Sequence, residues 1–297
     1  MKGIVTAGIG LALVTVALAD GGEVRREAVP ELSGHVGDAE NPTIAVVVSD
    51  PWGAGGHMLL RMPETLNTVH GLLFIDHHRD DMPPLYPSYP LPQWEREAGG
   101  SIGYSRTLGN GITYRASATP RPGAVDLAFT VENDSGRDTH VGAQFCLVCT
   151  PSELFADPHY ERTWIHTESG WTAASRDRGP MNPRWTLYPL EGGPDMEQQP
   201  DPQVWGISGL AGDEGLIAVE TPQGGRFIAL TWENPGMLMN NAMIPCIHAD
   251  PIWPPVPAGG EATVRGRIYF HEGSLDGLLE RYVRDFGHLA DQRADAQ

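Results

Sequence analysis

Short apolar runs separated by turn residues recur at roughly ten-residue intervals along the chain, a spacing typical of an all-β sandwich or barrel. Glycine and proline together supply 36 + 26 = 62 of the 297 residues, which provides the turns between such strands. The apolar runs are 43–48, 57–62, 70–75, 112–118, 125–131, 141–148, 162–166, 204–210, 216–220, 227–232 and 262–270. We therefore predict an antiparallel all-β fold.

One strong helical pattern lies near the end of the chain. Ser274 is a suitable N-cap, and apolar residues then recur at helical spacing as far as Leu289. We predict a helix over 274–289 whose apolar stripe packs on the outside of a sheet. Since no break in composition marks a second domain, residues 43–297 are expected to form one domain.

The first residues have the features of a secretory signal peptide. Lys2 precedes an apolar run, and Ala17-Leu18-Ala19 resembles a cleavage site. An uncleaved membrane anchor is the alternative, since the run has nearly the length of a membrane span. We predict a signal peptide at 1–19, a linker at 20–42, and a secreted or periplasmic protein without membrane contact after cleavage.

Three proline-rich stretches, 83–92, 179–202 and 245–257, interrupt the strand pattern. Proline cannot donate a hydrogen bond to a central ladder, so these stretches are predicted to be loops or sheet edges. Long loops in compact domains are commonly functional.

The charge excludes some partners. The formal net charge is −18, which argues against nucleic-acid binding because phosphate recognition needs clustered positive charge. Removal of 1–19 deletes Lys2 and no acid, which leaves 19 − 38 = −19 with arginine as every cation. Arginines suited to an anionic sugar are Arg61, Arg79, Arg106, Arg115 and Arg162. The oligomeric state is not predicted.

The cysteines allow several arrangements. Cys146 and Cys149 lie in one predicted strand with side chains on opposite faces. A disulfide from one of them to Cys246, three free thiols, and a zinc site formed by both with Cys246 and His248 are all open. No cofactor is expected, and a divalent cation, calcium or zinc, is the alternative.

Histidines and aromatic residues near turns suit a sugar site, because a pyranose stacks on rings and its hydroxyls need polar partners. Asp76-His77-His78-Arg79 follows a predicted strand, and 162–171 contains Arg162, Trp164, His166 and Trp171. Trp253 lies in the third proline-rich stretch.

The order of several motifs resembles the galactose mutarotase (aldose 1-epimerase) superfamily. These are 127–145 with Asn133 and Gln144, Trp232-Glu233-Asn234-Pro235, Gly260-Glu261 and the strand 262–270. The ending 267–274 is similar to exported members of unclear function. The resemblance implies an antiparallel supersandwich of two large sheets with a carbohydrate site.

The resemblance also implies roles for individual residues. Glu233 matches the family's general base, and His70 in Asn67-Thr-Val-His70-Gly71 matches a substrate-holding histidine. The family's acid histidine corresponds to Gln144, which cannot transfer a proton. His78, His166 and His248 are the candidate substitutes.

We therefore predict an exported carbohydrate-active enzyme that works by glutamate and histidine acid-base chemistry, either epimerase-like or a β-elimination lyase. Catalytic candidates are Glu233, His70, His166 and His248. Substrate-binding candidates are Gln144, His78, Arg79, Arg162, Trp164, Trp171, Trp253 and Asn234. Glu233 and a histidine should then converge across a cleft of about 5 to 8 Å. The alternative is a non-catalytic carbohydrate-binding or assembly protein with the same fold.

Overall fold

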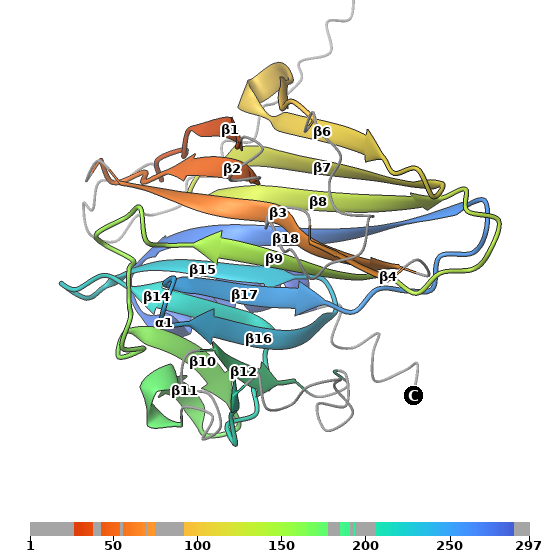
Figure 1. Cartoon of the computed structure of the whole chain (residues 1–297). Helices are drawn as coiled ribbons and strands as arrows, with labels where there is room; N and C mark the ends of the chain where they lie inside the picture. The colour runs from red at the N-terminus through yellow and green to blue at the C-terminus, as the bar shows by residue number, and fades with distance from the viewer. Residues whose placement is uncertain are drawn as a thin grey trace, which may run out of the picture.

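Two β-sheets, called sheet A and sheet B below, pack face to face, and one helix covers part of the outside of sheet B (Figure 1). The computed structural model describes residues 27–37, 43–53, 56–68, 71–74, 92–177, 185–190, 193 and 206–287. The prediction of an all-β sandwich with a C-terminal helix is confirmed. No helix in these ranges has the length and apolar character needed to cross a membrane.

Among the described strands, sheet A is antiparallel except for the pair β12 and β13 at its edge, which is parallel. Its order is β1 (Leu32–Val36), β2 (Ile44–Ser49), β3 (His57–Thr68), β9 (Gly142–Val148), β17 (Cys246–Pro251), β16 (Pro235–Asn241), β12 (Trp185–Pro189) and β13 (Gly206–Ile207). A further strand, β4 (Gly71–Phe74), pairs with β3.

Sheet B is antiparallel throughout the described residues. Its order is β11 (Gly170–Ala173), β10 (Thr163–Thr167), β14 (Leu216–Glu220), β15 (Arg226–Trp232), β18 (Gly260–Glu272), β8 (Ala124–Asn133), β7 (Ile112–Arg121), β6 (Ile102–Thr107) and β5 (Glu95–Arg96). Two short 3-10 turns, Ala98–Gly100 and Ala174–Arg176, follow β5 and β11.

The main core lies between the sheets. Alternate residues of the long strands point inward and are buried, as Val125, Leu127, Phe129 and Val131 of β8 do. Phe145 of sheet A stacks on Trp232 of sheet B with ring centroids 4.0 Å apart. The inner faces are therefore filled, and polar chemistry is left to the outer faces and the ends of the strands.

Helix α1 (Leu275–Phe286) packs on the outer face of sheet B, as predicted. The Ser274 hydroxyl caps it by accepting a hydrogen bond from the Gly277 amide at 3.1 Å. Buried Leu278 and Tyr282 contact the apolar residues that β14, β15 and β18 turn outward. The helix ends at Phe286, three residues before the predicted boundary at Leu289.

Two expectations about loops are wrong. Part of the predicted linker 20–42 is strand β1, because residues 32–36 pair with β2 along their length. The third proline-rich stretch contains β17, which lies inside sheet A between β9 and β16. Pro245 precedes this strand and Pro251 is its last residue. The residues between the two prolines can therefore pair with both β9 and β16.

Replacement of Leu278 by alanine should lower the free energy of unfolding by about 2–5 kcal/mol, because it removes a fully buried side chain between the helix and sheet B. Val283 in the same helix is exposed, and Val283→Ala should change stability by no more than about 0.5 kcal/mol. Urea unfolding followed by circular dichroism measures both. Equal effects of the two substitutions would contradict the packing of α1.

Candidate functional site

The outer face of sheet A carries a group of polar side chains across β3, β9 and β17. We call this group the sheet A cluster. Its members are Arg61, Glu64, Gln144, Cys146, Cys246, His248 and Asp250. The side chains of Arg61 and Glu64 are 18% and 13% exposed, whereas that of His248 is only 1% exposed. The cluster therefore extends from the buried surface of the sheet to partly accessible groups.

A β-bulge places Glu64 in this cluster. The register between β3 and β9 shifts between Arg61, opposite Cys146, and Thr65, opposite Gln144. Strict alternation would turn Glu64 inward with Met62 and Leu66, which are both in the core. Its carboxylate instead lies 3.1 Å from the Arg61 guanidinium on the outer face. Bulges commonly redirect a side chain in this way.

Strand β17 supplies the other side of the cluster by regular alternation. Ile247 and Ala249 belong to the core, so Cys246, His248 and Asp250 point outward. The Asp250 carboxylate accepts a hydrogen bond from the Phe145 amide at 2.9 Å, which fixes it against β9.

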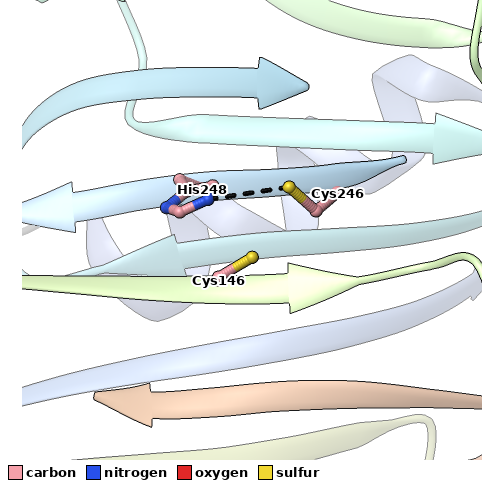
Figure 2. A group of neighbouring side chains, drawn as sticks. All are labelled: Cys146, Cys246 and His248. Carbon is pink, nitrogen blue, oxygen red and sulfur yellow. Dashed lines mark hydrogen bonds between the residues drawn. The ribbon is translucent and has the colours of Figure 1, made fainter. Parts of the chain in front are cut away.

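His248 lies at the centre of the cluster. Its Nε2 is 3.7 Å from Cys246 Sγ and 3.7 Å from Glu64 Oε2, and its Nδ1 is 3.7 Å from Asp250 Oδ2. Figure 2 shows Cys146 projecting from β9 toward Cys246 and His248 on the neighbouring strand. A buried imidazole is thus surrounded by two thiols and two carboxylates.

Burial controls the protonation of these groups. It raises the pKa of Cys146 well above its usual value, and the nearby Cys246 raises it further. Burial also raises the pKa of the Asp250 carboxyl, although His248 opposes this effect. Without a ligand, the Cys146 thiol therefore stays protonated at neutral pH.

Glu233 lies on the opposite side of the sandwich from His248. It follows β15, and its Oε2 accepts a hydrogen bond from the Arg265 amide at 3.0 Å. Glu233 and Arg265 line a cavity of about 280 Å³ on the outer face of sheet B, together with Asp126, Arg267 and Asp285. Arg267 pairs with both of these aspartates. Glu233 therefore does not converge with His248, one of the candidate histidines.

His166 also lies on the outer face of sheet B. Its Nδ1 is 2.7 Å from Asp213 Oδ1, and its ring meets Trp171 edge to face at 5.3 Å. Between the strand ends that carry His166 and Glu233, the Gly215 amide donates to the Tyr282 hydroxyl of α1. His166 and Glu233 are thus carried by strands that β14 keeps apart in sheet B.

Most of the predicted substrate-binding residues contact other parts of the protein and hold its fold together. Arg162 donates to the backbone carbonyls of Leu154, Ala156 and Glu220, so its guanidinium holds chain segments together. Trp253 is buried in the core against Phe129. Trp164 and Trp171 pack against the apolar cluster under α1.

The remaining predicted residues divide into three groups. Asn234 has a positive φ of 49° in the turn after β15, and its amide donates to the Ile252 carbonyl at 3.1 Å. Gln144 belongs to the sheet A cluster and accepts a hydrogen bond from the Thr65 hydroxyl at 3.0 Å. His70, His78 and Arg79 lie outside the described residues.

The cysteines are partly as predicted. Cys146 and Cys149 do point to opposite faces, with Cys149 in the main core and Cys146 on the outer face. The four-ligand zinc arrangement is therefore wrong, because Cys149 cannot reach His248 through the sheet. All three cysteines are free thiols.

The sequence analysis missed the roles of Glu64 and Asp250. Pro63 inside a strand pattern is a signal for a bulge, and it marks the place where Glu64 turns outward. The prolines around Asp250 predict a loop or a sheet edge, whereas Asp250 lies in β17 inside sheet A. Together the cluster offers a carboxylate and a guanidinium near the surface, and a set of possible metal ligands below them.

Comparison with known proteins finds solved structures with low identity and low TM-scores. No family model matches the chain, and no curated protein matches it in sequence. The similar solved structures include a putative aldose 1-epimerase from Escherichia coli K12, with 8% identity, a TM-score of 0.45, and coverage of 82% of this chain and 99% of that one.

A galactose mutarotase-like protein from Clostridium acetobutylicum has 10% identity, a TM-score of 0.45 and the same two coverages of 82% and 99%. A polysaccharide lyase has 9% identity and a TM-score of 0.41, with 86% of this chain matched to 34% of that one.

Cys149 should react slowly with iodoacetamide in the folded protein. Burial raises its pKa, and each unit of increase lowers the thiolate fraction about tenfold. At pH 8.5 we expect alkylation at least about 100-fold slower than in urea, where an exposed cysteine is roughly half ionised. Mass spectrometry of the peptide containing Cys149 measures the rate. Equal rates in buffer and urea would contradict its burial.

Proposed function

We propose that the protein binds a saccharide at the outer face of sheet A and acts on it there. The observation that carries this proposal is the placement of a guanidinium, a carboxylate and an amide, from Arg61, Glu64 and Gln144, on the same face of two adjacent strands. Sugar hydroxyls and carboxylates need polar partners held in fixed positions. The resemblance of the motifs to mutarotases supports a sugar as the ligand.

β-Elimination from a uronate fits these groups better than epimerisation. Ring opening by the family mechanism needs an acid where this chain has Gln144, and an amide cannot transfer a proton. Elimination needs a base for the proton next to the carboxylate and a cation to stabilise the resulting enolate. Glu64 is the proposed base that takes this proton, and Arg61 is the proposed cation. As the carbon–carbon double bond forms, the bond to the departing glycosidic oxygen breaks, and that oxygen takes a proton from the protonated Glu64 or from water.

The two residues already lie in suitable positions. Their 3.1 Å ion pair holds both side chains at the same partly exposed point. A substrate carboxylate could take the place of Glu64 beside Arg61, because arginine binds carboxylates with two parallel hydrogen bonds. Buried His248 does not reach a substrate directly, so its role is to position neighbouring groups.

A non-catalytic carbohydrate-binding protein is the second candidate. It is favoured by Gln144 at the position of the family's acid, and by the pairing of Glu233 with Arg265. Such a protein would use the same polar face for binding alone.

Substitution of Glu64 by glutamine tests the enzymatic proposal. Loss of a general base should lower turnover by about 10²–10⁴-fold. Glu233→Gln, which changes the same functional group on the opposite face, should retain wild-type turnover. The measurement is a screen of uronate-containing and neutral saccharides for new ultraviolet absorbance from unsaturated uronates and for anomeric interconversion.

Each outcome of this screen decides between the candidates. Unchanged turnover in Glu64→Gln would remove Glu64 from the mechanism, and loss of turnover in Glu233→Gln would move the site to sheet B. Saturable saccharide binding without turnover in the wild type would favour the non-catalytic candidate.

We also propose that the protein is exported, on the basis of the leader-like residues 1–19. N-terminal sequencing of protein recovered from the medium or periplasm should begin at Asp20. A chain that retains Met1 in the membrane fraction would support the uncleaved anchor instead.

A further inference from the structure

Three side chains of the sheet A cluster form a compact set of metal-ligand atoms. The Sγ atoms of Cys146 and Cys246 and a ring nitrogen of His248 lie within 4.8 Å of one another, and all three residues are buried. Figure 2 shows them on two adjacent strands, with the histidine ring nitrogen turned toward Cys246.

The spacing of these atoms suits a zinc ion. Zinc bonds of about 2.3 Å to sulfur and about 2.0–2.1 Å to nitrogen, at tetrahedral angles, place the two ligand atoms about 3.6 Å apart. The distance from Cys246 Sγ to His248 Nε2 is 3.7 Å. A zinc ion therefore needs little movement of these two side chains.

A disulfide fits the same pair of cysteines less well. Cys246 lies opposite Val148, and His248 lies opposite Cys146, so the two cysteines are diagonal neighbours on the ladder. Diagonal Cα atoms in an antiparallel pair are about 7–8 Å apart. Disulfides seldom form when the Cα atoms are more than about 7 Å apart. A bridging ion spans this longer separation.

Asp250 is placed to orient the histidine. Its Oδ2 lies 3.7 Å from His248 Nδ1, and neither of these buried atoms has a hydrogen-bond partner among the described residues. A shift of less than 1 Å would form that hydrogen bond. Histidine ligands of zinc almost always donate their second ring nitrogen to a carboxylate, a carbonyl or water.

We propose that Cys146, Cys246 and His248 bind one zinc ion through two thiolates and Nε2, with Asp250 as the partner of Nδ1. On binding, each thiol releases its proton to solvent. Two sulfur ligands and an imidazole favour zinc over calcium, which prefers oxygen. This inference does not depend on the carbohydrate proposal.

Glu64 would lie beside the ion. The Glu64 Oε2 atom lies 3.7 Å from the same Nε2 that would bind zinc, and its side chain reaches the surface. Three protein ligands with an open fourth position are typical of catalytic zinc sites, whereas structural sites have four protein ligands. The fourth ligand would be either water or the Glu64 carboxylate, which lies as far from Nε2 as Cys246 Sγ does.

Metal binding to the full chain tests this proposal without any saccharide. Chelator-treated protein is dialysed against zinc and its metal content is measured, and we expect one tightly held zinc per chain. In a parallel sample, cobalt(II) should give an intense thiolate-to-cobalt charge-transfer band and visible bands typical of tetrahedral coordination. Stoichiometric zinc uptake without the thiolate band in the cobalt sample would overturn the ligand assignment.

The cysteines provide a matched control. Cys146→Ser and Cys246→Ser should each weaken zinc binding by at least 100-fold and abolish the cobalt band. Cys149→Ser makes the same chemical change on the core face of the same strand region and should leave both unchanged. Circular dichroism of each variant checks that it is folded. The proposal fails if wild-type protein retains no zinc, or if folded Cys149→Ser loses the ion as Cys146→Ser does.

Asp250→Asn tests the positioning role separately. It retains the side-chain shape but weakens the partner of Nδ1, so zinc affinity should fall by about 10–100-fold while the cobalt band is retained. Unchanged affinity would remove Asp250 from the site.

Discussion

The burial of two sheet faces against each other determines where the ionisable side chains of this protein can lie. The long strands of both sheets, such as β3, β8 and β9, give side chains to the layer between the sheets, where Phe145 stacks on Trp232. An ionisable group in that layer would lose its hydration without compensation. The ionisable side chains that could do chemistry are therefore on the outer faces. The two faces differ, because α1 covers part of sheet B with apolar contacts.

This constraint explains why the cluster on sheet A depends on a bulge. Regular alternation along β17 turns Cys246, His248 and Asp250 outward, but the same rule would bury Glu64. The two extra residues of β3 between its pairings with Cys146 and Gln144 release Glu64 from the alternation. Its carboxylate then meets both Arg61 and His248. One local irregularity thus joins the strands into a site.

The sequence predicted the fold better than the site, for reasons visible in single residues. Period-two patterns and the Ser274 cap are local signals, and they identified most strands and the helix. The face on which a residue lies depends on long-range pairing, so the motif around Glu233 could not show that it faces away from His248. Proline composition hid β17, because composition does not reveal that Pro245 and Pro251 lie at its ends.

The energetics of the buried cluster favour a ligand. A buried polar group without a hydrogen bond costs about 1–3 kcal/mol, and apolar residues of similar volume would avoid that cost. His248 Nδ1 and Asp250 Oδ2 both lack such a bond among the described residues. A thiol is also a weak partner for Nε2. Metal coordination would turn the thiols into strong ligands and give the imidazole proton a defined acceptor, so the same residues would stabilise the sheet.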